Sequence, residues 1–151
     1  MPQNITQVHF IKLRLFDTKG KEVANTFYWR SNDKYKGRKT LTGPTSSGFE
    51  DLSKLKQVQL KTRYQTYQEG DRHFIKAEIK NPSSTVAFFT QLQLLGQDKK
   101  PVRPSFYTDN FFSLLPGESK TVIIETAASD MPSEPTFVVK GWNIKPSSFK
   151  L

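Results

Sequence analysis

The chain contains no cysteine and no long apolar run. Without cysteine, neither a disulfide framework nor a thiolate metal site can form, and redox chemistry says nothing about the compartment. No segment approaches the roughly 20 apolar residues that a membrane-spanning helix needs. The first ten residues also lack the basic and then apolar order of a secretory signal peptide. We therefore expect no membrane span in this sequence.

Residues that carry metal or acid–base chemistry are sparse. His9 and His73 are the only histidines, and no acids stand near them at metal-ligand spacing, so no metal or other cofactor is expected. A Gly-rich phosphate loop and a serine elbow are both missing. Most of the fourteen acids fall in predicted turns, whereas Glu78 and Glu125 alternate with apolar strand neighbours and are expected to face water. Because no constellation of acids converges, we assign no catalytic residue.

The formal net charge of +9 makes nucleic acid a partner to consider. The basic residues, however, are spaced at two or four along strand-like segments, which places each set on one face of a strand. Examples are Lys12 with Arg14, Lys61 with Arg63, and Lys76 with Lys80. There is no basic run, zinc-knuckle spacing or RNP-like aromatic motif. We therefore expect solvated sheet faces and no nucleic-acid partner.

Alternation of apolar and polar residues predicts strands along most of the chain. Segments 8–16 and 23–29 predict one hairpin, with Ile11, Leu13 and Leu15 on the half-buried side. Segments 58–65 and 73–80 predict a second hairpin around the turn at 69–71. Further strands are expected at 85–95, 102–107, 119–126 and 136–144, the last containing Trp142.

These strands, separated by turn signals, predict one antiparallel β-sandwich domain. Its expected bounds are 8–144, with 1–7 as a disordered start or a linker from a preceding domain and 145–151 as a C-terminal tail. Twelve phenylalanines suit the thin core between two sheets.

Two connections and a turn stand out between the strands. Segment 31–51 is long and polar, a kind of loop that is commonly functional or packed on something else. Segment 51–56 predicts a helical turn capped by Asp51 or Ser53. Pro116-Gly117 predicts a tight type II turn. Just before it, Tyr107, Phe111 and Phe112 surround Thr108-Asp109-Asn110, and we expect these aromatic neighbours to order the loop.

Five segments taken in order suggest a family. They are NTFYWRSNDK at 25–34, FEDLSKL at 49–55, KNPSSTVAFFTQLQL at 80–94, YTDNFFSLLPGES at 107–119 and VKGWN at 139–143. Together they resemble the C-terminal immunoglobulin-like domain of glycoside hydrolase family two enzymes of the exo-β-glucosaminidase and β-mannosidase type. The likeness covers about residues 8–143. Its most specific parts are the Tyr28-Trp29 pair, the Asp-Asn-aromatic loop before Pro-Gly-Glu, and the terminal Gly-Trp-Asn, whereas Arg30 stands where an apolar residue is expected.

The resemblance implies an all-β, immunoglobulin-like antiparallel β-sandwich of about seven to nine strands. It also implies a parent enzyme, a retaining β-glycosidase in which a (β/α)8 barrel with paired glutamates performs catalysis. In such enzymes the C-terminal sandwich is an accessory domain packed on the other domains, which are therefore the expected partners. The resemblance further leads us to expect that the parent is exported, with its signal peptide upstream. The substrate sugar of the parent stays open between mannoside and glucosaminide.

The aromatic residues have two interpretations, sugar stacking and core filling. For Trp142 we expect the core. For Tyr35 and the loop from Tyr107 to Asn110 the two interpretations are balanced, because loop residues can be presented to a partner. The candidate surface for contact with a domain or a sugar is therefore Trp29, Tyr35, Tyr107, Asp109 and Asn110. If that surface binds an oligosaccharide, the alternative function is an independent carbohydrate-binding module.

Overall fold

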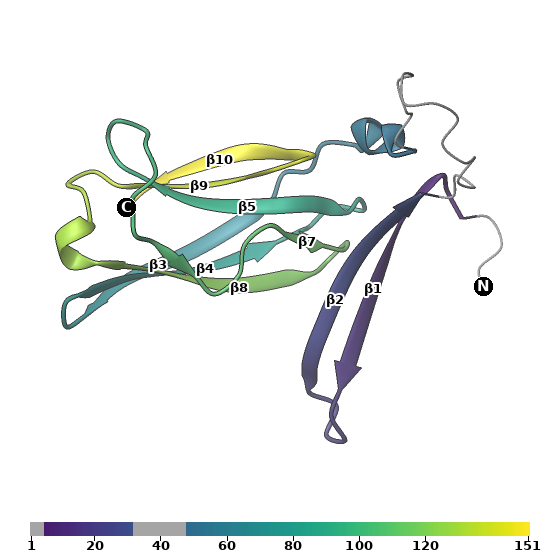
Figure 1. Ribbon diagram of the computed structural model, residues 1–151, viewed down its shortest axis with the longest axis horizontal. Coiled ribbons are helices and arrows are strands. Elements are labelled where there is room, and N and C mark those ends of the chain that lie inside the picture. Colours follow the sequence, from purple (N-terminus) through teal and green to yellow (C-terminus); the bar gives the residue numbers. More distant parts are fainter. Residues whose placement is uncertain (1–4, 32–47) are drawn as a thin grey trace, which may run out of the picture. The chain divides into compact units, whose positions relative to one another are not determined.

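The computed structural model describes residues 5–31 and 48–151 (Figure 1). The chain divides into two compact units, Met1–Leu55 and Lys56–Leu151, which we describe separately. Residues 1–4 of the expected linker lie outside the described residues. So does most of the long polar segment at 31–51, including Tyr35.

The first unit contains the predicted N-terminal hairpin, which is confirmed. Strands β1 (Val8–Phe16) and β2 (Glu22–Ser31) pair antiparallel, with Ile11 opposite Tyr28. At the turn, the Asp17 carboxylate accepts hydrogen bonds from the backbone N–H of Lys19 at 2.9 Å and of Lys21 at 2.8 Å. The predicted helical turn also exists, as the 3-10 helix η1 (Glu50–Lys54). The predicted cap is wrong, because the cap position is Phe49 and no side chain caps the helix.

The hairpin buries less apolar surface than its pattern predicts. Leu13 and Leu15, expected on a half-buried side, are 57% and 61% exposed. In the described part of the chain β1 and β2 pair only with each other and join neither sheet of the sandwich. The hairpin lies in the unit Met1–Leu55, whereas both sheets of the sandwich lie in the unit Lys56–Leu151.

The second unit is an antiparallel sandwich of two four-stranded sheets, which confirms the predicted fold class (Figure 1). One sheet has the order β10-β9-β5-β7 and the other the order β3-β4-β8-β6. The first sheet comprises β5 (Ala87–Leu95), β7 (Phe112–Leu114), β9 (Thr136–Gly141) and β10 (Ile144–Lys150). The second comprises β3 (Lys61–Glu69), β4 (Arg72–Lys80), β6 (Phe106–Tyr107) and β8 (Ser119–Ala127), which is followed by the 3-10 helix η2 (Ala128–Asp130).

The core lies between these two sheets and follows the predicted alternation. On β4, Ile75, Ala77 and Ile79 are buried, and Ile75 pairs with the buried Ile124 of β8. The facing sheet contributes buried residues from β5 and β9, among them Leu92, Leu94, Phe137 and Val139. Each large side chain removed from water in this way contributes about 1.5–3 kcal/mol. The period of two therefore decides which face of each strand forms the core.

The turn between β7 and β8 confirms the prediction from Pro116-Gly117. The backbone N–H of Glu118 donates to the carbonyl of Leu115 at 3.1 Å, and Gly117 has a φ of 79°. Such a positive φ suits glycine at the third position of a type II turn. The buried Asn81 supports the strand that leads into it, since its side-chain amide donates to the carbonyls of Leu114 at 3.0 Å and Thr85 at 2.8 Å.

The end of the chain departs from prediction. Segment 136–144 is not one strand, because β9 ends at Gly141 and β10 begins at Ile144. Residues expected as a tail therefore form β10, in which Phe149 pairs with Phe137. Trp142 occupies the intervening turn and is 59% exposed, so the expectation that it fills the core is wrong. The expected strand at 102–107 is likewise shorter, since only β6 forms there.

Two neighbours of Trp142 build this turn. A Cβ on Gly141 would lie 2.8 Å from the carbonyl oxygen of Phe89 and 3.1 Å from that of Phe88, so only glycine lets the two backbones approach. The buried Asn143 accepts from the backbone N–H of Phe88 at 2.9 Å, and its side-chain amide donates to the carbonyls of Val86 at 2.8 Å and Lys56 at 2.9 Å. Asn143 thus fastens the turn to β5 and to the segment before β3.

We predict that Asn143→Ala lowers the free energy of unfolding by roughly 2–4 kcal/mol, because three backbone groups lose their partner and buried polar groups without partners are costly. The matched control is Trp142→Ala, which removes a larger but exposed side chain and should cost about 1 kcal/mol or less. Urea unfolding followed by circular dichroism measures both changes. Equal losses for the two variants would contradict this role for Asn143.

Candidate functional site

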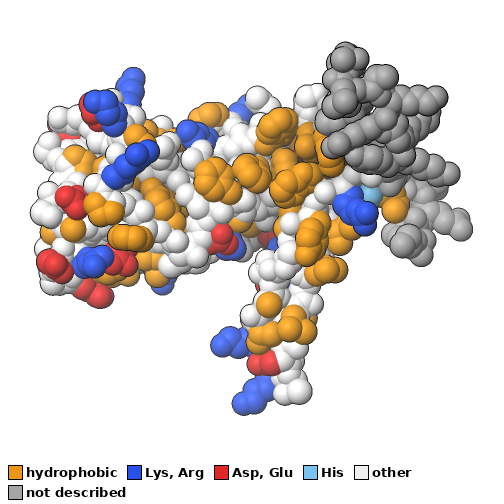
Figure 2. Space-filling model, viewed as in Figure 1, with side chains coloured by type: hydrophobic (Ala, Val, Ile, Leu, Met, Phe, Trp, Pro, Cys, Tyr) orange, Lys and Arg blue, Asp and Glu red, His pale blue; other side chains and the backbone are white. Residues whose placement is uncertain are grey.

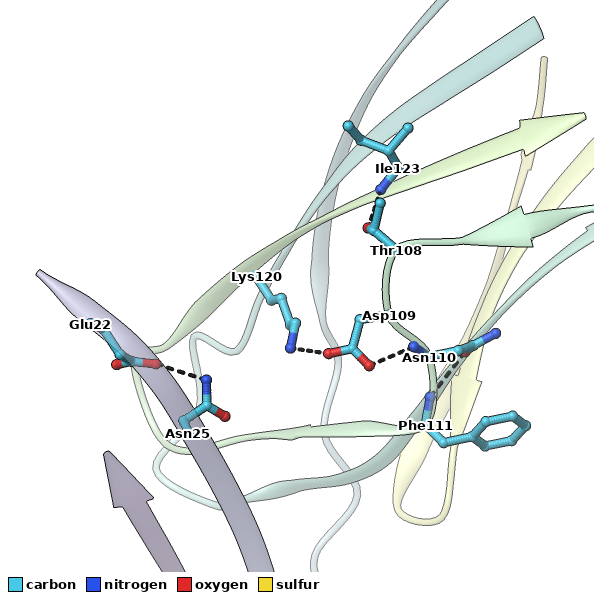
Figure 3. A network of polar contacts seen from close by, with 8 residues as sticks. All are labelled: Glu22, Asn25, Thr108, Asp109, Asn110, Phe111, Lys120 and Ile123. Carbon is cyan, nitrogen blue, oxygen red and sulfur yellow. Dashed lines mark hydrogen bonds and ion pairs between the residues drawn. The ribbon is translucent and has the colours of Figure 1, made fainter. Parts of the chain in front are cut away.

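The predicted loop around Asp109 is the place where the chain crosses from one sheet to the other (Figure 3). It follows β6, which pairs with β8, and precedes β7, which pairs with β5. The backbone N–H of Thr108 donates to the carbonyl of Ile123 at 3.0 Å, and the N–H of Ile123 donates to the Thr108 hydroxyl at 3.0 Å. These two bonds extend the pairing of β6 with β8 into the loop.

Asn110 attaches the loop to the other sheet. Its side-chain oxygen accepts from the backbone N–H of Leu92 at 2.8 Å, and its side-chain nitrogen donates to the carbonyl of Leu92 at 3.0 Å. The same oxygen accepts from the N–H of Phe111 at 3.0 Å. β7 pairs with β5 only at two residues of β5, Ala87 and Thr90. At Leu92 the Asn110 amide forms the two hydrogen bonds that the backbone of a longer paired strand would form.

Tyr107 also connects the two sheets. It belongs to β6, yet its phenolic oxygen accepts from the backbone N–H of Leu94 on β5 at 3.0 Å. Burial raises the pKa of the Tyr107 phenol above its ordinary value of 10.0. The hydrogen bond from Leu94 favours the phenolate and opposes this pKa shift, but only in part. The phenol therefore stays protonated and bound to β5 at neutral pH.

Asp109 forms the polar contacts on the more exposed side of the loop. Its carboxylate accepts from the backbone N–H of Asn110 at 2.7 Å and pairs with the ammonium of Lys120, as Figure 3 shows. That ammonium also lies 5.2 Å from the centre of the Phe112 ring. Both partners of the ion pair are about a third exposed, so the pair contributes about 1 kcal/mol or less.

The structure brings together three of the five predicted site residues, Tyr107, Asp109 and Asn110, and bonds their polar atoms to their own domain. These polar bonds hold the loop, and of the aromatic neighbours expected to order it, Phe112 is buried in the core whereas Phe111 is 48% exposed. Trp29 lies on β2 in the other unit, opposite Phe10. Figure 3 also shows a contact within that hairpin, in which the Asn25 amide donates to Glu22 at 2.7 Å. The fifth residue, Tyr35, lies outside the described residues.

Among the exposed aromatic residues beside this loop, sequence reasoning did not single out Phe89, and it assigned Trp142 to the core. The ring of Phe89 lies 5.4 Å from that of Phe111, and the buried Phe88 lies 6.5 Å from Trp142. The available signal was local, because Asn110 directly precedes Phe111 and Asn143 directly follows Trp142. The side chains of Asn110 and Asn143 point into the domain, and the aromatic residue beside each of them is exposed.

Across residues 5–31 and 48–151, no group of three or more His, Cys, Asp and Glu side chains is placed to hold a metal ion. Within the same residues, none of the helices is long and apolar enough to cross a membrane. Glu125, expected to face water, forms an ion pair with Arg72 on the neighbouring strand and is partly exposed.

We predict that Asn110→Ala lowers the free energy of unfolding by roughly 2–3 kcal/mol, since it leaves both backbone groups of Leu92 without this partner. Asp109→Ala removes a partly exposed ion pair from the adjacent position and should cost about 1 kcal/mol or less. Chemical denaturation of the two variants in parallel tests this ranking. If Asp109→Ala were the more damaging change, Asn110 would not be the residue that joins the loop to β5.

The raised pKa of Tyr107 predicts a loss of stability in alkali. Below the unfolded-state pKa of about 10 the stabilisation is complete, and it declines as the pH rises through the higher folded-state pKa, because the unfolded chain loses the proton first. Tyr107→Phe should abolish this alkaline loss of stability. At neutral pH it should lower the free energy of unfolding by about 1–3 kcal/mol, because the backbone N–H of Leu94 loses its acceptor. Phenolate absorbance and unfolding free energy against pH measure it, with the exposed Tyr67→Phe as control. An unchanged alkaline profile in Tyr107→Phe would refute it.

Comparison with known proteins agrees with this architecture. The family described as the exo-β-D-glucosaminidase Ig-fold domain matches residues 40–144. An exo-β-D-glucosaminidase of Streptomyces avermitilis is 30% identical over 149 residues, covering 92% of this chain and 16% of that protein. An exo-β-D-glucosaminidase of Amycolatopsis orientalis is 28% identical, covering 92% of this chain and 14% of that protein. The chain thus spans less than a fifth of the length of these relatives.

Among solved structures, the fold resembles that of an exo-chitosanase of Amycolatopsis orientalis, with a TM-score of 0.81 and 24% identity. That match covers 97% of this chain and 18% of the other. At this level of identity the structural likeness supports the fold alone. The family match covers more than half of the chain and includes both the Asp-Asn-aromatic loop and the Gly-Trp-Asn turn. The chain therefore belongs to the family of exo-β-D-glucosaminidase Ig-fold domains.

Proposed function

We propose that this chain is a non-catalytic accessory domain of a multidomain family-two glycoside hydrolase of the exo-β-glucosaminidase type. The observation that carries the proposal is the family match over residues 40–144, within relatives about six times as long as the chain. Both curated relatives are exo-β-D-glucosaminidases, which favours glucosaminide over mannoside as the substrate class of the parent enzyme.

The geometry of the candidate site supports a structural role for it. Asn110 and Tyr107 use their polar side-chain atoms to join β5 to the loop and to β6. Asp109 is engaged by Asn110 and Lys120. A catalytic or sugar-binding group needs a polar atom directed at the ligand, whereas these atoms are directed at the protein itself. The accessory domain then acts by packing on the catalytic barrel and shaping the rim of its active site.

We expect the full-length parent to hydrolyse p-nitrophenyl β-D-glucosaminide much faster than the corresponding β-mannoside, and the isolated 151-residue chain to hydrolyse neither. Release of nitrophenol measures both activities. Turnover that co-purifies with the chain through a second, unrelated column would refute the accessory role.

A binding titration separates this proposal from the alternative of an independent carbohydrate-binding module. Calorimetry with glucosamine and mannose oligosaccharides should show no saturable heat at millimolar sugar. Saturable binding that Tyr107→Ala or Tyr35→Ala weakens would favour the alternative.

A further inference from the structure

Four basic side chains gather on the outer face of the sheet β3-β4-β8-β6, and we call them the basic face: Lys61, Arg63, Lys76 and Lys80. All four are exposed, whereas the odd-numbered residues from Ile75 to Ile79 on β4 are buried between the sheets. Side chains alternate along a strand, so the even-numbered residues of β4 point away from the core. The strand register places the basic residues of β3 beside those of β4, because Lys61 lies opposite Lys80.

The pairing of Lys61 with Lys80 does not favour the sheet itself. Directly opposed side chains have Cβ atoms about 4.5–5.5 Å apart, and like charges in that arrangement are destabilising. In the next row Arg63 lies opposite Glu78, whose carboxylate offsets one of the four charges. Within residues 5–31 and 48–151, none of the four basic side chains forms an ion pair. The basic face is therefore a positive surface without close counter-charges in the described domain.

A row of aromatic side chains crosses the same outer face and borders the basic face. From β6 to β3 the row consists of residues that each lie opposite the next, namely Phe106, Glu125, Phe74 and Tyr67. The rings of Tyr67 and Phe74 stack with their centres 5.0 Å apart, and Phe106 is 58% exposed. Glu125 forms an ion pair with Arg72, and Figure 2 shows acidic and basic side chains side by side at the end of the sandwich where β3 turns into β4. That ion pair leaves the three rings as the apolar part of the row.

The combination of exposed rings and unpaired cations favours an acidic polysaccharide as the ligand. Lysine and arginine bind anionic groups through charge-assisted hydrogen bonds. An exposed aromatic ring can pack against the apolar C–H face of a sugar ring. Phe106 and Phe74 lie two strands apart, a separation of about 9–10 Å that consecutive sugar rings can span. A polymer of glucosamine is itself positively charged, so the basic face would repel it.

We infer that the basic face and the aromatic row together bind an acidic polysaccharide, with its anionic groups on the lysines and its sugar rings against Phe106. Single-stranded nucleic acid meets the same two requirements, since it carries phosphates and bases that stack on aromatic rings. The choice of a saccharide rests on the proposed function, in which the parent enzyme acts on one. Binding here would attach that enzyme to an acidic polymer.

Calorimetric titration of the 151-residue chain with polygalacturonate, a linear polymer of uronic acid, tests the inference. We expect saturable binding that weakens as the salt concentration rises, because salt screens charges on an exposed surface. Dextran, a neutral polysaccharide, should give no saturable heat. Absence of saturable binding to polygalacturonate at low salt overturns the inference. Tighter binding of single-stranded DNA of equal total charge also overturns it, and would assign the face to nucleic acid.

A pair of double variants separates this face from the net charge of the chain. Lys61→Gln with Lys80→Gln should weaken polygalacturonate binding by at least about tenfold, since two charge-assisted contacts are lost. The matched control is Lys145→Gln with Lys150→Gln, which removes the same charge from exposed positions on β10 of the other sheet and should change the affinity by less than about twofold. Equal losses in the two double variants would reduce the binding to net charge and refute the inference.

A stability measurement shows that lost binding is not lost folding. The Lys61→Gln, Lys80→Gln variant should be at least as stable to urea as the unaltered chain, because it removes a directly opposed pair of like charges. A less stable variant would contradict this account of the pair.

The aromatic row has its own test. Phe106→Ala should weaken polygalacturonate binding by roughly fivefold, whereas Phe16→Ala, which removes a ring that is 50% exposed on the hairpin, should leave it unchanged. Equal affinities of the two variants would remove the aromatic row from the site. None of these titrations measures hydrolysis, so failure of the inference is distinguishable from failure of the proposed function.

Discussion

The sandwich depends on two asparagine side chains whose amides form backbone hydrogen bonds at places where strand pairing ends. Asn143 bonds to three residues in two segments, to Lys56 before β3 and to Val86 and Phe88 at the start of β5, and Asn110 pairs with both backbone groups of Leu92. A primary amide offers the same donor and acceptor as a peptide group, so it can occupy a ladder position from a side chain. Buried backbone groups left without partners are costly. Asn110 satisfies such groups where the chain crosses between the sheets, and Asn143 does so at the turn between β9 and β10.

These amides also determine which side chains reach the surface. At the turn after β9, the close approach of Gly141 to β5 and the inward amide of Asn143 leave Trp142 outside. In the crossover loop, the inward amide of Asn110 is followed by an exposed Phe111 and a buried Phe112. The exposed positions of Phe111 and Trp142 are therefore a consequence of how the neighbouring asparagines bond to the backbone.

The sequence predicts the sandwich well because period-two burial is a local signal, as in Ile75, Ala77 and Ile79 on β4. The sequence does not predict features that depend on contacts between residues far apart in the chain. Apolar residues continue as far as Trp142, but the chain turns there, and Asn143 bonds to residues more than 50 positions away. Strand β10 was missed because Pro146 interrupts its pattern, and proline is tolerated there because β10 is an edge strand, with β9 as its ladder neighbour in the described sheets. For the candidate site, the sequence predicts an ordered loop from Tyr107 to Asn110, but its residues bond inward to partners that no local pattern reveals.

The N-terminal hairpin shows that alternation identifies a strand without identifying what covers it. Leu13, Leu15 and Tyr28 lie exposed on a ribbon whose outer edges pair with no other strand in the described residues. Unpaired edges beside exposed apolar side chains can recruit further strands from neighbouring molecules. Self-association would begin at the ribbon while the sandwich remained folded.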